Sequence, residues 1–191
     1  ASAAVGNRVR IDAEKDIEIA SSMNINEILV SASVSGGSSK VAVGGTIAVV
    51  VDRAKAETTV GLGSELVSVS GDLKLTSSIS ETLINILASA SAAPKANAAI
   101  AGVVAVLDSE TAAKVVVADS AVLKAAGGNV IILADSSALL VEVGCSVGVG
   151  SNAGVGATIE VNSFDRDIIA EVGNVLINAG KLVIIDTAGT D

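Results

Sequence analysis

The chain repeats itself at a fixed distance. The stretch VGGTIAVVV at residues 43–51 returns as VGATIEVNS at residues 155–163, and a looser copy, IAGVVAVLD, lies halfway between them at residues 100–108. Successive copies are therefore 56 residues apart. A constant period predicts similar units stacked along one axis, so we expect residues 1–191 to form a single solenoid segment of about 3.4 units.

The pattern inside each unit predicts strands. Apolar and polar residues alternate in Val9-Arg10-Ile11, in Ile17-Glu18-Ile19 and in their counterparts, which is typical of a strand with one buried face. Glycine, Asn and Asp at joints such as Gly71-Asp72 favour turns. A helical alternative exists for the Ala- and Leu-rich residues 118–126, but β-branched residues are frequent in every unit and no capping box begins a helix. We therefore predict an all-β chain.

A shorter period predicts the size of the coil. Steps of 18 or 19 residues from Val9 meet an aliphatic residue every time, and we expect these ten to stack as a structural core ladder in which Ile47, Val103 and Ile159 share one buried column. The ladder comprises Val9, Ile28, Ile47, Leu66, Ile84, Val103, Val122, Leu140, Ile159 and Ile177. The pattern predicts a right-handed parallel β-helix of about ten coils, with three coils in each 56-residue unit.

Composition excludes several kinds of partner. Half of the residues are hydrophobic, yet there is one Phe and no Trp or Tyr, so the core is expected to consist of aliphatic side chains. The net charge is −9 and the 12 Lys and Arg residues are scattered, which argues against binding to nucleic acid. The longest apolar runs, near ten residues, are shorter than the roughly 20 that a membrane-spanning helix needs, so we expect no membrane span.

One combination of motifs resembles a known family. An opening VGGTIAVVV strand, an acidic turn at residues 52–55, a segment ending in Val60-Gly61 and a VSVSGDLKL tract at residues 67–75 are similar to the repeat regions of bacterial leukotoxin-type and filamentous-haemagglutinin-type surface adhesins. The resemblance covers the whole chain and implies a secreted β-helical shaft of a much larger Gram-negative adhesin or toxin. It supplies no catalytic residues.

The titratable residues offer little chemistry. With no His there is no Ser-His or Cys-His pair and no histidine metal ligand. The best acidic cluster is Asp165-Arg166-Asp167, in which an extended segment would place both Asp side chains on one face and Arg166 on the other. Such a pair could serve a carbohydrate-active β-helix, although a solvated turn between coils is the simpler interpretation. Residues 148–153 imitate a dinucleotide fingerprint but continue into a strand, so we expect no catalytic residues, no metal and no cofactor.

Tracts of small residues recur at residues 31–39, 88–93 and 144–150. They are expected to place Ser33, Ser89 and the single cysteine, Cys145, in one column. The column is either a narrow corner of the coil or a flat strip against which another solenoid can lie. The apolar residues at 9–11 and 182–185 resemble internal strands, which predicts either a longer shaft or copies stacked end to end.

Taken together, these patterns favour a structural rod over an enzyme. We expect a segment of a surface adhesin, toxin shaft or extracellular filament, located outside the cell or on its surface. Its partners would be other copies, associated end to end or laterally, and a host or neighbouring-cell surface. The alternative is a carbohydrate-binding or carbohydrate-active parallel β-helix, which would require acidic side chains to converge in a groove.

Overall fold

The computed structural model describes residues 1–36, 40–93 and 98–190, and within them the chain is all-β. The strands are β1 (Ser2–Val5), β2 (Arg10–Ala13), β3 (Ile17–Gly36), β4 (Val41–Val60), β5 (Glu65–Ser68), β6 (Leu73–Ala93), β7 (Ala98–Val117), β8 (Val122–Ala125), β9 (Val130–Gly150), β10 (Ala153–Val172), β11 (Leu176–Ala179) and β12 (Val183–Thr190). No helix among the described residues is long and apolar enough to cross a membrane.

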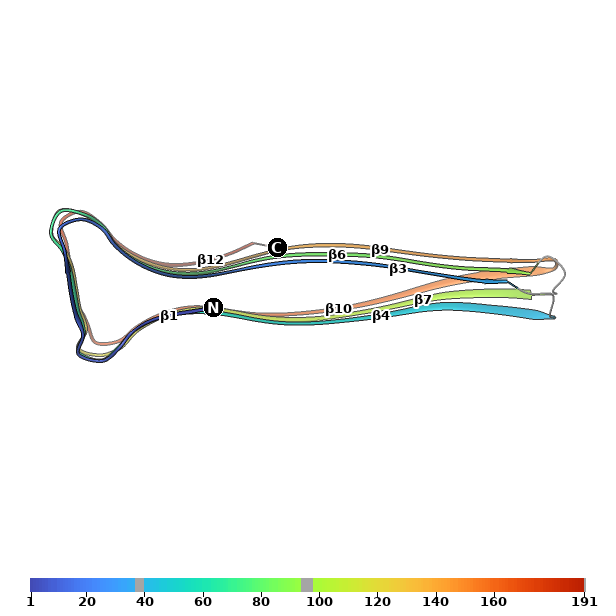
Figure 1. Ribbon diagram of the computed structural model, residues 1–191, viewed down its shortest axis with the longest axis horizontal. Helices are drawn as coiled ribbons and strands as arrows, with labels where there is room; N and C mark the ends of the chain where they lie inside the picture. The colour runs from blue at the N-terminus through green and yellow to red at the C-terminus, as the bar shows by residue number, and fades with distance from the viewer. Residues whose placement is uncertain (37–39, 94–97, 191) are drawn as a thin grey trace.

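The strands form three sheets in which every described pairing is parallel. Sheet A has the order β1-β4-β7-β10, sheet B the order β11-β8-β5-β2, and sheet C the order β12-β9-β6-β3. The chain visits A, B and C in turn and repeats this circuit four times. Sheets A and C run alongside each other as two long layers, and the short sheet B joins them at one end (Figure 1). The predicted parallel β-solenoid is confirmed, and its right-handed sense stays a prediction.

The coil is three times larger than predicted. Ser21 of β3 pairs with Ser77 of β6, 56 residues later, so one 56-residue unit makes one coil and the chain makes about four coils instead of ten. The two long strands of a coil each have about 20 residues, so residues 17–19 and 28–30, predicted as separate strands, both belong to β3. Likewise, the predicted acidic turn at residues 52–55 lies inside β4. Neighbouring coils satisfy the backbone groups, so a polar residue does not end the strand.

The register between coils changes along the stack, and this breaks the predicted core ladder. Val41 pairs with Ala98 across 57 residues, whereas Ala98 pairs with Ala153 across 55. A one-residue slip turns a side chain to the other face of its sheet. Ile47 and Ile159 therefore align with Val104 on the outer face of sheet A, whereas Val103 points inward beside Thr46.

Burial of the ten ladder residues follows from that slip. Only Leu66 and Val103 are buried; Val9, Ile28, Ile47 and Ile159 are exposed, and Ile84, Val122, Leu140 and Ile177 are half-buried. The single buried column predicted for these ten residues is therefore wrong.

The apolar core lies beside sheet B. Leu66 and Leu123 from sheet B pack with Leu73, Leu75 and Val115 from the adjoining parts of sheets C and A. We call this part the proximal half. The distal half is the remainder of sheets A and C, residues 28–36, 41–51, 84–93, 98–108, 141–150 and 153–163. In the proximal half the ordinary burial of aliphatic side chains stabilises the stack.

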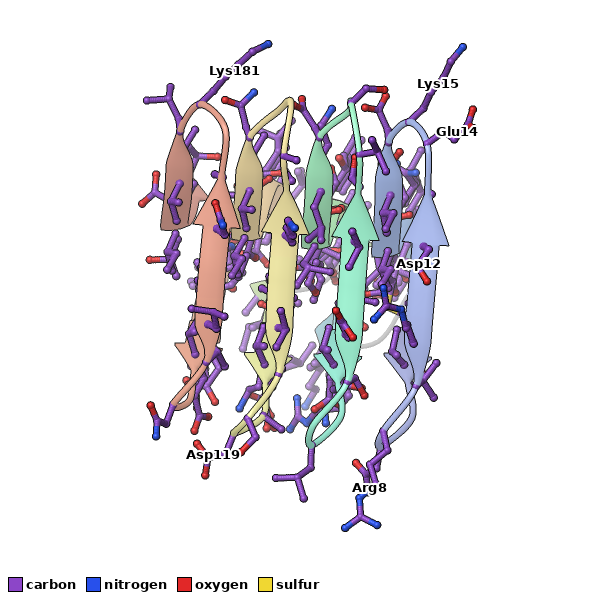
Figure 2. The ribbon with its side chains drawn as sticks, turned by 90° about the vertical axis from the view of Figure 1, so that its left-hand side faces the viewer. Arg8, Asp12, Glu14, Lys15, Asp119 and Lys181 are labelled. Carbon is purple, nitrogen blue, oxygen red and sulfur yellow. The ribbon has the colours of Figure 1, made fainter. Side chains whose placement is uncertain are left out.

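The turns at sheet B are linked from coil to coil. The carboxylate of Asp16 accepts a hydrogen bond from the Asp72 backbone N–H (2.7 Å), and Asp72 accepts one from Asn129 (2.8 Å). The Asn129 side chain in turn accepts a hydrogen bond from Leu182 (3.2 Å). These hydrogen bonds lie at the predicted Gly/Asn/Asp joints, which do form turns (Figure 2). The hydrogen bond from the Asn129 backbone also lowers the pKa of Asp72.

The opposite corner of sheet B uses the left-handed backbone conformation. Arg8, Gly63 and Ser120 have φ values of 57°, 63° and 61°, and each lies in the turn that precedes a sheet B strand. Figure 2 shows Arg8 and Asp119 at this end, away from Lys15 and Lys181. Because the strained position recurs in successive coils, the turn shape is inherited by stacking even where the residue is not glycine.

The face assignments predict opposite results for two aspartate substitutions. Val103→Asp places a charge at a position that is 1% exposed and should lower the free energy of unfolding by about 3 to 5 kcal/mol. Ile47→Asp changes a side chain that is 77% exposed and should cost about 1 kcal/mol or less. Urea unfolding followed by circular dichroism at low protein concentration measures both values. Equal losses would contradict the register.

Candidate functional site

Small polar side chains fill the interior of the distal half. Thr46 Oγ1 lies 2.8 Å from Ser33 Oγ and donates a hydrogen bond to the Ala88 carbonyl of sheet C (2.9 Å). Ser33 Oγ stacks on Ser89 Oγ at 3.2 Å, and Ser146 Oγ lies 3.3 Å from Thr158 Oγ1. These contacts join sheets A and C, which converge toward the distal end (Figure 1). The small-residue tracts therefore form a narrow interior; residues 37–39 of the first tract lie outside the described residues.

Cys145 does not belong to the serine column. Ser89 pairs with Ser146, whereas Cys145 pairs with Ala88 and is exposed on the outer face of sheet C. The predicted alignment with Ser33 and Ser89 is wrong by one residue because β6 and β9 pair across 57 residues.

A pair of carboxyl groups lies inside the solenoid at the border between the two halves. Glu81 of β6 is 2% exposed, and Ser109 of β7 donates a hydrogen bond to its Oε1 atom at 2.8 Å. Asp52 of β4 is adjacent to Glu81 and pairs in register with Ser109. Among the described residues, Asp52 Oδ2, Glu81 Oε2 and Thr111 Oγ1 are enclosed without a hydrogen-bond partner. Three facing strands thus bring orphan oxygens together in one place.

Protonation explains how these carboxyl groups coexist. Burial raises the pKa of Glu81, and the negative charge of Asp52 raises it further, against the opposing effects of the Ser109 hydrogen bond and of Arg166. A protonated Glu81 has an O–H donor that the adjacent Asp52 carboxylate can accept. The pair therefore behaves as two acids that share one proton.

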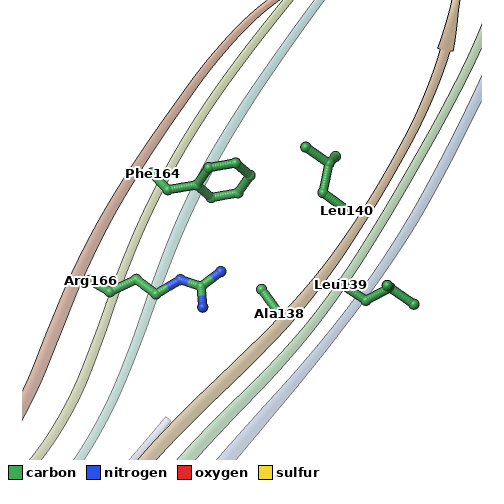
Figure 3. Close-up of a pocket in the computed structure, with 5 residues that line it drawn as sticks. All are labelled: Ala138, Leu139, Leu140, Phe164 and Arg166. Atoms are coloured by element: carbon green, nitrogen blue, oxygen red, sulfur yellow. The ribbon is translucent and has the colours of Figure 1, made fainter. Parts of the chain in front are cut away.

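A cavity of about 420 Å³ lies in the last described coil, lined by Ala138, Leu139, Leu140, Phe164 and Arg166. Phe164 and Arg166 project from β10 toward Ala138 and Leu140 of β9 (Figure 3). The Arg166 guanidinium carbon lies 5.6 Å from the centroid of the Phe164 ring. The volume is within the range of small-molecule pockets. The lining combines apolar side chains with a cation, which suits binding and offers neither a nucleophile nor a general base.

The predicted acidic cluster is part of a strand. Asp165, Arg166 and Asp167 lie within β10, with both Asp residues exposed and Arg166 on the inward side, as an extended segment requires. The simpler interpretation, a turn between coils, is therefore wrong. Lys114 Nζ lies 3.0 Å from Asp167 Oδ2. The cavity beside the two Asp residues holds about 30 Å³, far below the 300 Å³ or more typical of ligand pockets.

Neither of the other sequence features forms a reactive site in the described part of the chain. Residues 148–150 end β9 and Ala153 begins β10, so no helix follows the fingerprint-like segment. Within residues 1–36, 40–93 and 98–190, no group of three or more His, Cys, Asp or Glu side chains is arranged to hold a metal ion.

Comparisons with protein families, curated proteins and solved structures found no match to this chain. The adhesin resemblance therefore depends on the sequence motifs alone. The structure supports its coarser part, a β-solenoid built from stacked parallel strands.

The Asp52–Glu81 pair was not found from the sequence, although a signal existed. Glu81 occupies an inward position in the alternation of Ile79, Glu81 and Leu83, and Asp52 continues the inward phase of Val50. A charged residue in the buried phase of a strand is unusual and indicates either a partner or an altered protonation state.

The raised pKa of Glu81 makes stability depend on pH in a defined direction. The folded chain holds the Glu81 proton more tightly than the unfolded chain does, so this stabilisation is complete below the ordinary pKa of Glu and is lost as pH rises through the folded-state pKa. Glu81→Gln keeps the shape and stays neutral, so the variant should be more stable than wild type at neutral pH and similar near pH 4. Urea unfolding across that range measures the difference.

The matched control is Glu18→Gln, which changes an exposed carboxylate on the same sheet. It should follow the wild-type pH dependence. Carboxylates with lowered pKa values, such as Asp72, contribute equally to all three proteins and cancel in the comparison. A Glu81→Gln variant that is less stable than wild type at neutral pH would show that an ionised Glu81 is favoured.

Proposed function

We propose that this chain is a structural segment of a secreted bacterial surface adhesin, toxin shaft or extracellular filament, located outside the cell or on its surface. The observation that carries the proposal is the in-register repetition of one coil outline: each of the four coils adds a strand to sheets A, B and C beside the previous coil. Such a fold gains length coil by coil without changing its cross-section. The segment acts through its shape and its association with other copies.

The surface chemistry supports a role in association more than in catalysis. Flat aliphatic faces cover the distal half, and the described carboxylate pair is enclosed instead of lining a groove. The negative net charge keeps such an apolar chain in solution. A host or neighbouring-cell surface is the partner that the adhesin resemblance implies.

The edges of the sheets support end-to-end association. β10 forms one edge of sheet A, and its residues 153–163 are exposed. At the other edge, β1 covers only residues 57–60 of β4. Exposed edge strands present N–H and C=O groups that pair readily with another strand. Copies that stack through these edges continue the parallel ladder.

A carbohydrate-binding β-solenoid is the second candidate, and the cavity with Phe164 and Arg166 is the observation that favours it. Aromatic and guanidinium groups are common in sugar and acidic-sugar sites. Binding of acidic oligosaccharides that is lost in Phe164→Ala, with the coil fold intact, would favour this function over a purely structural one.

The structural function predicts concentration-dependent association. Wild-type chain at micromolar concentration should form larger species in sedimentation velocity and elongated particles in negative-stain micrographs. Leu182→Lys combined with Ile184→Lys places charges at the edge that includes β12 and should abolish the elongated particles. The matched control is Ser78→Lys with Ser80→Lys on the inner strand β6. A wild-type chain that stays monomeric, or an edge variant that still elongates, would contradict end-to-end association.

Location is tested separately. Antibodies raised against the chain should label the surface of intact cells that produce it, seen by immunogold microscopy. Label confined to the cell interior would contradict the proposed function whatever the state of association.

A further inference from the structure

The distal half has its polarity reversed relative to an ordinary sheet sandwich. Its interior holds hydroxyl groups such as those of Thr46 and Ser33, whereas its outer faces carry aliphatic side chains. On sheet A, the outward residues of 41–51, 98–106 and 153–161 form one apolar area across β4, β7 and β10, which we call the distal patch. Val43, Ile47, Val49 and Ile159 are among its exposed members. An aliphatic area of this extent on flat β-structure indicates a surface that is covered in use.

A charged border limits the distal patch on the side of sheet B. On β4 the next outward residues are Arg53 and Lys55, and on β10 they are Asp165 and Asp167. The border is thus basic on one edge strand and acidic on the other, with β7 between them.

We propose that the distal patch is the interface through which a second copy of this chain binds laterally, related by a two-fold axis parallel to the strands. This inference rests on the proposed structural function and names the surface that lateral association uses. An axis in this direction lies over β7 and places β4 of one copy opposite β10 of the other. Lys55 then faces Asp167 of the second copy, and Arg53 faces Asp165, so the border is complementary to itself.

The size of the distal patch fits a protein interface at the lower limit. Eleven residues at about 3.3 Å each and three strands about 4.8 Å apart give roughly 500 Å² of flat face per copy. Two copies bury about 1,000 Å², which is close to the minimum for a specific complex. The row of Gly45, Gly102 and Ala157 across the three strands leaves the face without a central obstruction. We therefore expect a weak, reversible dimer.

A lipid bilayer is the other possible cover, and the backbone argues against it for this chain. In the described structure, β10 and residues 41–56 of β4 lie at open edges of sheet A. In hydrocarbon, each unsatisfied N–H or C=O group costs several kcal/mol. A second copy covers the aliphatic face and leaves these edges in water, where they stay hydrated.

The decisive variant is Gly102→Glu. Gly102 lies in the middle strand of the distal patch, and the nearest atom to an added Cβ is the Ala157 carbonyl oxygen at 3.9 Å, an ordinary contact. The substitution therefore places a charge in the patch without strain. The control is Ala112→Glu, a small-to-Glu change on the same face of the same strand, in the charged border. Both variants should keep the wild-type unfolding midpoint.

Sedimentation equilibrium should show at least a tenfold weaker association constant for Gly102→Glu, and less than a threefold change for Ala112→Glu. Edge stacking is suppressed in this experiment by the Leu182→Lys, Ile184→Lys background, so only lateral contacts are measured. Ala88→Glu, on the outer face of sheet C, should also leave association unchanged. An unchanged Gly102→Glu, or a loss confined to Ala88→Glu, would overturn the proposal.

A charge exchange tests the orientation. Lys55→Glu should weaken association, and adding Asp167→Lys should restore it, because the two positions face each other only in the proposed two-fold arrangement. Their present partners, Glu57 at 2.7 Å and Lys114 at 3.0 Å, form exposed pairs that contribute little to folding. Failure of the double variant to recover association would overturn the arrangement.

Flotation with phosphatidylcholine vesicles separates the two possible covers. The wild-type chain should stay with the protein fraction. Flotation with vesicles that Gly102→Glu abolishes, in a chain that does not self-associate, would overturn the proposal in favour of lipid. Loss of lateral association alone leaves the surface labelling and end-to-end stacking unaffected, so failure here is distinct from failure of the proposed function.

Discussion

The parallel hydrogen-bond ladder between coils is the interaction on which the structure depends. Strands of about 20 residues in sheets A and C pair along their whole length, for example Val41–Val60 with Ala98–Val117. Since the backbone is satisfied by the coils above and below, side chains are released from the usual demand that the interior be apolar. The proximal half keeps an aliphatic core, and the distal half replaces it with hydroxyl groups and close contact between sheets. Both are stable within one coil outline.

Much of the fold follows from the sequence because the repeat and the β pattern are independent signals. The 56-residue period, the all-β class, the parallel solenoid and the Gly/Asn/Asp turns beside sheet B are all visible in the residues. The size of the coil is not, because turn residues are the usual sign that a strand ends and the long strands contain few. Polar residues such as Ser21 and Glu81 interrupt the hydrophobic pattern without interrupting the strand. Their neighbours in the next coil keep the backbone paired.

Side-chain faces were harder to predict than the fold. Turn lengths differ between coils, so the offset between paired residues changes from 57 to 55 along sheet A. Any fixed step therefore loses the correct face after one coil, as the opposite positions of Ile47 and Val103 show. The same drift separates Cys145 from the serine column. Asp52 and Glu81 come together only because β4 and β6 face each other across the interior, a relation that no spacing within either strand reveals.

The corner links at sheet B have a mechanical consequence. Asp16, Asp72 and Asn129 connect each coil to the next at one point, beside two long ladders that share the load. Tension along the stacking axis acts first on the edge coil, because inner coils are held on both sides. Once its ladder opens, that coil releases about 56 residues and lengthens the chain by roughly 190 Å. A shaft of such coils would yield in discrete steps and dissipate work at each one, while the remaining coils keep their shape.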